Sequence, residues 1–120
     1  MNQALRTDWP RPPSCIPAHR LQEPPNGSRV AVAGLVLVRQ RPGTAKGVVF
    51  LSLEDETGVA NIIVWENIFQ KFRKAVMGGR MLRIYGRVQR DGAVTHVIAD
   101  KVEDISFMLD MLADPNEEQP

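Results

Sequence analysis

Two neighbouring segments of the chain alternate between apolar and other side chains with the two-residue period of a β-strand. The first covers residues 47–54 and the second covers residues 59–65, and their alternate apolar positions fall on one face. Between them the sequence EDETG (54–58) predicts a tight turn, whose carboxylates we interpret as solvated. The pattern predicts two antiparallel strands packed on a core. The predicted core positions are Val49, Leu51, Leu53, Ala60, Ile62 and Val64.

The opposite face of these two strands carries the candidate binding residues. It places the aromatic ring of Phe50 and the amide of Asn61 on one exposed surface, with Arg39, Arg41 and Lys46 at its edge. Aromatic rings that stack on bases, beside cations that follow the phosphates, are typical of single-strand nucleic-acid binding. Core packing is the alternative role of Phe50, and solvation is that of the three cations. The other positions predicted to point outward are Val48, Ser52, Ile63 and Trp65.

Three further strands are predicted, at residues 30–40, 81–90 and 93–102. The first is a β-branched run interrupted by Gly34, where we expect a bend that lets one strand serve two sheets. The last two are joined by the dipeptide Asp91-Gly92, a strong two-residue hairpin signal. On the outer face of the strand at 81–90 we expect Met81, Arg83, Tyr85, Arg87 and Gln89.

Two short helices complete the predicted elements. Residues 67–77 repeat apolar side chains at helical spacing, with Asn67 as the candidate N-cap and Gly78-Gly79 as the end. We expect Trp65 to pack against this helix in preference to stacking on a base. A second apolar segment, residues 106–113, predicts a short helix before the acidic end of the chain.

The order of these elements predicts the fold class. An all-β, five-stranded Greek-key barrel with a helix between the third and fourth strands is the OB-fold. SH3-like and ferredoxin-like arrangements place their helices elsewhere. We predict an OB-fold domain at 30–105, a proline-rich arm or linker at 1–29, and a short helix with an acidic tail at 106–120.

Charge is distributed unevenly along the chain. Residues 29–90 hold eleven Lys and Arg against four acids, a net +7, whereas residues 91–120 hold eight acids against one lysine, a net −7. One cysteine, Cys15, excludes a disulfide framework within the chain. No apolar run approaches a membrane span and no signal peptide is recognised, so we expect a reducing compartment, the cytoplasm, and no membrane partner.

The segments VAGLVLVRQRPGTAKGVVFLSLEDETGVANIIVW and LRIYGRVQRDGAVTHVIADKVEDIS closely resemble the OB domain of bacterial error-prone DNA polymerases, which are C-family paralogues of the replicative polymerase. The resemblance covers about residues 17–106. More distantly, FLSLEDETGVAN resembles the anticodon-binding OB domain of aspartyl- and lysyl-type tRNA synthetases. This second resemblance implies that Phe50 stacks on a base and that Asn61, usually Gln there, contacts a base edge.

The resemblance implies a nucleic-acid-binding module without catalytic activity, because the palm and its metal-binding carboxylates do not fit in 120 residues. We expect weak, sequence-tolerant binding of single-stranded DNA, with RNA as the alternative ligand, and neither cofactor, metal nor small-molecule substrate. The predicted binding residues are Arg39, Arg41, Lys46, Phe50, Asn61, Arg83 and Arg87. Arg83 and Arg87 have an alternative role, pairing with Asp100 or Glu103 on the next strand, which we favour for at least one of them.

A competing function is a protein-interaction module within a translesion or replication complex. The acidic C-terminal part of the chain supports it, as do two apolar residues predicted to point outward, Ile63 and Met81. Cover of the outer sheet face by the N-terminal arm or by the C-terminal helix would favour this function over nucleic-acid binding.

Overall fold

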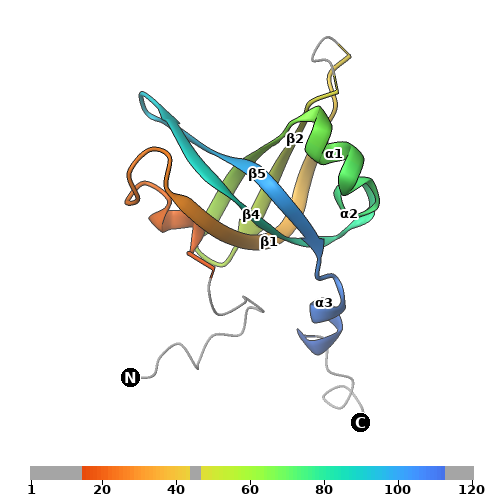
Figure 1. The fold of residues 1–120 in the computed structure, drawn as a ribbon. Helices are drawn as coiled ribbons and strands as arrows, with labels where there is room; N and C mark the ends of the chain where they lie inside the picture. Colours follow the sequence, from red (N-terminus) through yellow and green to blue (C-terminus); the bar gives the residue numbers. More distant parts are fainter. Residues whose placement is uncertain (1–14, 44–46, 113–120) are drawn as a thin grey trace.

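A computed structural model describes residues 15–43 and 47–112, which form a closed barrel of five strands (Figure 1). The strands are β1 (Arg29–Gln40), β2 (Val49–Asp55), β3 (Gly58–Val64), β4 (Met81–Asp91) and β5 (Val94–Asp104). They pair in the order β1-β2-β3-β5-β4, and β1 pairs with β4 to close the barrel. Only β3 and β5 are parallel within these residues. The predicted five-stranded fold is confirmed.

The barrel closes because β1 bends and pairs with two neighbours. Residues 29–35 pair with β4 and residues 35–40 pair with β2, with a bulge between Val36 and Val38. A Cβ atom at Gly34 would lie 2.5 Å from the carbonyl oxygen of Glu54, so a side chain does not fit at this crossing. The bend predicted at this glycine is confirmed.

The interior is formed by the alternate residues that the sequence pattern selected. All six predicted core positions of β2 and β3 are at most 3 % exposed. Val48 and Ile63, both predicted to point outward, are instead buried. Val48 precedes the first residue of β2, and Ile63 lies between its neighbours Phe50 on β2 and Ile98 on β5, which cover it from both sides.

The segment between β3 and β4 forms two helices, α1 (Glu66–Lys71) and α2 (Arg73–Gly78), where one was predicted. The break falls at Phe72, whose φ of −119° and ψ of 32° are not helical. Phe69 and Val76 are fully buried, as the helical spacing requires. The cap is Trp65 rather than Asn67, and the side chain of Trp65 is half exposed.

Residues 15–28 pack on the barrel, whereas the sequence indicated a linker or poorly ordered arm. The 3-10 helix η2 (Ala18–Arg20) brings Ala18 and Leu21 into the core, at the end of the barrel opposite α1 and α2 (Figure 1). The backbone N–H of Ile16 donates to the carbonyl of Ala31, 2.8 Å away. Trp9 lies outside the described residues. The arm therefore closes one end of the barrel.

The turn between β2 and β3 is organised by one buried carboxylate, Asp55, which is 5 % exposed. Its Oδ1 accepts hydrogen bonds from the N–H and hydroxyl of Thr57, at 2.7 and 2.6 Å, and from the N–H of Gly58 at 3.1 Å. Its Oδ2 accepts from the N–H of Ala18 at 2.8 Å. The solvated interpretation of the acidic turn is thus wrong for Asp55, which joins the turn to the arm.

The C-terminal helix α3 (Phe107–Leu112) follows β5 at one end of the barrel (Figure 1), and it packs against residues of β1 and β4. Met108 and Leu109 contact a small cluster that contains Met81, and this methionine is fully buried. Met81 was predicted to lie exposed on the outer face, and α3 is the reason that it does not. The helix, together with Cys15 of the arm, therefore covers the outer face of β1 and β4 around Met81.

Candidate nucleic-acid interface

A row of side chains crosses the outer face of four strands. Phe50 on β2 lies opposite Ile63 on β3, Ile63 lies opposite Ile98 on β5, and Ile98 lies opposite Arg87 on β4. Phe50 and Ile98 are half-buried, and side chains that are directly opposite on one face contact each other. Phe50 and Ile98, with the buried Ile63 between them, therefore form an apolar strip with an arginine at one end.

A groove follows β3 beside this strip. Its larger part, about 520 Å³, is lined by the apolar Ile63 and Val94 and by polar or charged side chains, those of Asn26, Gln89, Arg90, Asp91 and His96. These groups offer donors and acceptors to base edges and phosphates.

The smaller part of the groove, about 280 Å³, is lined by Asn61, Gln22 and Thr95 among others, and Val94 borders both parts. We call the two parts together the β3 groove. Asn61 is exposed and lies opposite Ser52, one alternate position from Phe50. The structure thus brings Phe50 and Asn61 to one surface, as predicted.

The sequence interpretation missed Gln89 and His96, which lie opposite each other across the β4–β5 hairpin. The hairpin was predicted with Asp91-Gly92 as its turn, but Asp91 pairs with Val94, so the turn residues are Gly92 and Ala93. Gly92 has the positive φ, 65°, that the first position of a type II′ turn requires. The alternation of β4 and β5 contained the signal, since both residues point away from the core.

Arg39 and Arg41 do not line the β3 groove. Arg39 lies opposite Leu51, an inward position, and its guanidinium donates to the carbonyls of Val76 at 2.8 Å and Gly79 at 2.5 Å. A cation at the end of α2 also suits the helix dipole. Arg39 thus connects β1 to α2, and the surface position predicted for it is wrong.

Arg41 lies over the ring of Phe69, with its guanidinium carbon 4.5 Å from the ring centroid, and Arg73 is 5.2 Å from the same centroid. Such cation–π contacts contribute about 0.5–1 kcal/mol at exposed sites. Arg41 itself is exposed. Lys46, the third cation predicted at this edge, lies outside the described residues.

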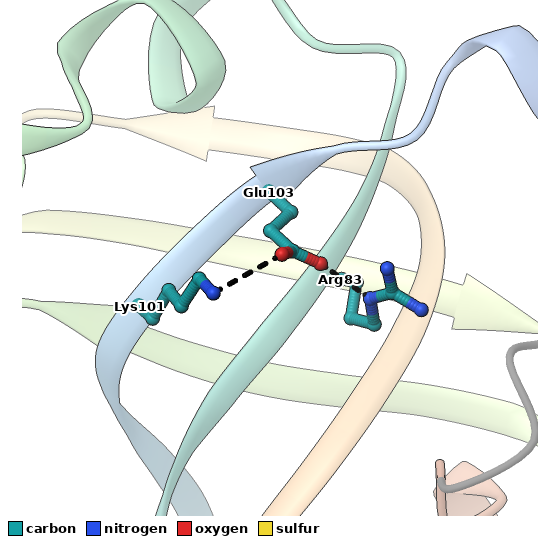
Figure 2. A network of polar contacts seen from close by, with 3 residues as sticks. All are labelled: Arg83, Lys101 and Glu103. Atoms are coloured by element: carbon teal, nitrogen blue, oxygen red, sulfur yellow. Dashed lines mark hydrogen bonds and ion pairs between the residues drawn. The ribbon is translucent and has the colours of Figure 1, made fainter.

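Arg83 and Arg87 both pair with acids of β5, which confirms their alternative role. Arg83 Nε lies 2.6 Å from Glu103 Oε1, and Lys101 Nζ lies 3.3 Å from Oε2 of the same carboxylate (Figure 2). Arg87 Nε is 3.5 Å from Asp100 Oδ2, a looser pair whose side chains are 50 % and 40 % exposed. Arg83 is therefore held by the network, whereas Arg87 remains accessible.

The hydrogen bond from Arg83 holds the pKa of the Glu103 carboxyl below its ordinary value; partial burial opposes this shift, and Lys101 adds to it. At pH values above the ordinary pKa of this carboxyl, where it is ionised in the folded and in the unfolded protein, the network stabilises the fold. This contribution is lost as the pH falls through the lower pKa of the folded protein.

We predict that Glu103→Gln lowers the free energy of unfolding at neutral pH by about 1 kcal/mol. The difference from the unmodified protein should shrink as the pH falls below the carboxyl range, because both chains are then uncharged at this position. Urea unfolding at several pH values measures it, with Asp100→Asn as the control for an exposed pair. A difference that stays constant with pH would contradict an electrostatic origin.

Within residues 15–43 and 47–112 no helix has the length and apolar character needed to cross a membrane. The same residues contain no cluster of His, Cys, Asp or Glu suited to a metal ion.

The bent first strand, the barrel order and the groove beside β3 define an OB-fold domain. The family model described as OB-fold nucleic acid binding domain, tRNA anti-codon type, matches residues 30–105, and the chain belongs to this family.

The error-prone DNA polymerase of Ruegeria pomeroyi is 59% identical over 87 residues, which are 72% of this chain and 8% of that protein. The error-prone DNA polymerase of Caulobacter vibrioides is 56% identical over 99 residues, 82% of this chain and 9% of that protein. The resemblance to this polymerase domain is confirmed. The chain spans less than a tenth of the length of these relatives, so what is matched is a small OB domain and not a whole polymerase.

Solved structures agree with this assignment. Asparaginyl-tRNA synthetase from Pyrococcus horikoshii, complexed with asparaginyl-adenylate, superposes with a TM-score of 0.61 at 26% identity, over 76% of this chain and 22% of the synthetase. An OBody bound to hen egg-white lysozyme has a TM-score of 0.63 at 16% identity, over 80% of this chain and 92% of the OBody, a likeness that shows the fold alone.

Proposed function

We propose that this domain binds single-stranded DNA on the outer face of β2 and β3, as a module of an error-prone DNA polymerase that acts in translesion synthesis in the cytoplasm. The observation that carries the proposal is the apolar strip that begins at Phe50 and lies beside the polar β3 groove. An aromatic ring can stack on any base, whatever the sequence of the nucleic acid, which suits a polymerase that must accept any template.

Two further features support the proposal. Arm residues, among them Gln22 and Asn26, line the β3 groove without filling it, and α3 packs around Met81 on β4, so the strip and the groove remain open to a ligand. Few cations line the groove, and we expect few phosphate contacts and therefore weak binding. Inside a polymerase, tethering raises the effective concentration of the template and offsets this weakness.

The test is a titration of the isotope-labelled chain with a short oligo-dT, followed by amide chemical shifts at low and at higher salt. Binding should move the amides of Phe50, Asn61 and His96, and salt should weaken the response. A parallel titration with oligo-rU shows whether RNA is preferred. If these amides do not move while the chain remains folded, the proposed interface is excluded.

A protein-interaction role is the second candidate, and α3 favours it. Phe107 and Met111 are 62% and 66% exposed and stand four residues apart on this helix, so they share one side. The two apolar residues first considered for this role, Ile63 and Met81, are buried and do not support it.

The joint substitution of Phe107 and Met111 by serine should leave oligonucleotide binding unchanged and abolish a contact made by α3. Size-exclusion chromatography of the chain mixed with the remainder of an error-prone polymerase measures that contact. Elution of the unmodified chain apart from the polymerase, or co-elution of the double variant with it, would contradict this role.

A further inference from the structure

Two arginines lie directly opposite each other on the outer face of β1 and β4. Arg29 pairs in register with Arg87, and both residues are exposed. Like charges at opposite positions of neighbouring strands destabilise a sheet. Arg87 has one partner, Asp100, at 3.5 Å, and Arg29 makes no ion pair or side-chain hydrogen bond within the part of the chain that the structure describes. Two guanidinium groups thus face one carboxylate, and one positive charge is left over.

This pair continues the row of side chains that forms the apolar strip. The register runs from Phe50 through Ile63 and Ile98 to Arg87, and from Arg87 to Arg29. Neighbouring strands are about 4.8 Å apart, so Arg87 lies about 14 Å from Phe50 along the curved surface. A strand of DNA that leaves the strip in this direction meets the two arginines next.

A shallow depression of about 330 Å³ adjoins the pair, lined by Arg29, Asp100 and Tyr85 among others. The ring of Tyr85 lies 5.8 Å from the guanidinium carbon of Arg83 and 5.3 Å from Lys101 Nζ. An aromatic ring beside exposed guanidinium groups offers an apolar surface for a sugar or base and a cationic position for its phosphate.

We propose that Arg29 and Arg87 bind a phosphodiester of the DNA strand that lies on the apolar strip, so that the binding path continues across β5 onto β4 and β1. This inference rests on the proposed function for the direction of the strand, while the phosphate site itself follows from the arginine pair. A phosphate between the two guanidinium groups removes their mutual repulsion, which the protein without ligand retains. The site takes a phosphate of any sequence, because it contacts no base edge.

The experiment compares the variants R29Q and R87Q of the whole chain with K74Q, which removes one charge from an exposed position of α2. Fluorescence anisotropy follows binding of labelled oligo-dT of about 4 and about 12 nucleotides, the range of site sizes of OB-folds. We expect R29Q and R87Q each to weaken the longer oligonucleotide about fivefold and to leave the shorter one unchanged. The slope of log affinity against log salt should fall by about 0.7 for each lost phosphate contact.

The outcomes separate this inference from the proposed function. If R29Q and R87Q bind the longer oligonucleotide as tightly as the unmodified chain, or if K74Q weakens its binding equally, the phosphate site is overturned. This holds even if Phe50→Ala weakens binding of both oligonucleotides. If Phe50→Ala changes neither length while R29Q and R87Q still weaken the longer one, the arginine site stands and the strip fails. Urea unfolding of R29Q gives an independent readout: relief of repulsion leaves stability unchanged or higher, and a marked decrease would indicate a structural role and overturn the inference.

Discussion

Replacing Asp55 by alanine is expected to lower the free energy of unfolding by about 3 kcal/mol, a large part of the 5–15 kcal/mol that holds a typical domain together. The carboxylate is buried and accepts four hydrogen bonds, from Thr57 (two), Gly58 and Ala18. Alanine removes the acceptor and leaves the buried N–H of Ala18 and the partly buried donors of Thr57 and Gly58 without this partner, which costs more than the bonds contribute when formed. Urea unfolding, followed by the change in far-ultraviolet circular dichroism, measures the loss.

Two further variants distinguish the buried carboxylate from its charge. Asp55→Asn keeps one oxygen acceptor of similar position and should lose about half as much stability. Glu54→Ala removes the same charge from the neighbouring, half-buried position and should change stability by at most about 0.5 kcal/mol. If Glu54→Ala costs as much as Asp55→Ala, the turn is stabilised by its charge and not by the hydrogen bonds of Asp55.

The substitution Asp55→Ala should also release the arm from the barrel. The N–H of Ala18 donates to Asp55, and the N–H of His19 donates to the hydroxyl of Thr57 at 3.1 Å. Hydrogen exchange at these two amides should therefore accelerate in Asp55→Ala more than exchange at core amides of β2. The arm and the turn then lose order together, as the shared carboxylate requires.

Strand alternation predicted the fold and the faces on which Phe50 and Asn61 lie, because a barrel strand has an inner and an outer face. Phe50 and Asn61 were placed correctly, since both lie within strands whose parity the core residues fix. Arg39 was predicted at the edge of this surface, but the register between β1 and β2 sets it opposite the inward Leu51, and its guanidinium bonds to α2. That register depends on the bulge between Val36 and Val38, which the sequence does not reveal.

Long-range polar contacts could not be predicted from the sequence, for a different reason. The bond between Asp55 and Ala18 joins residues 37 positions apart, and the bonds from Arg39 to α2 join residues 37 and 40 positions apart. No local propensity encodes such a partner. Pairing of Arg83 with Glu103 was predictable, because hairpin neighbours on one face are set by alternation and by the turn.

The two ends of the described chain each cover a part of the barrel. The arm closes the end beside the β2–β3 turn, and α3 covers Met81 on β4. Since exposed apolar surface on a sheet attracts other chains, these covers leave the strip at Phe50 as a place where apolar side chains still reach solvent.

Phe50→Ala is expected to weaken binding of oligo-dT about fivefold to 150-fold, because stacking on one aromatic ring contributes about 1–3 kcal/mol per base. The half-buried ring lies at the start of the strip, opposite Ile63. Phe50→Tyr retains the ring and should bind almost as tightly as the unmodified chain. Anisotropy titrations at one low salt concentration measure all three proteins, with circular dichroism to establish that each is folded.

Phe50→Leu is the decisive control, since it keeps an apolar side chain of similar length but no aromatic face. If stacking holds the base, the leucine variant should lose most of the affinity that alanine loses. Leu37→Ala, at an exposed apolar position of β1, should leave binding unchanged. Full affinity in Phe50→Leu would show that general apolar contact holds the strand, and the role proposed for the aromatic ring would then be wrong.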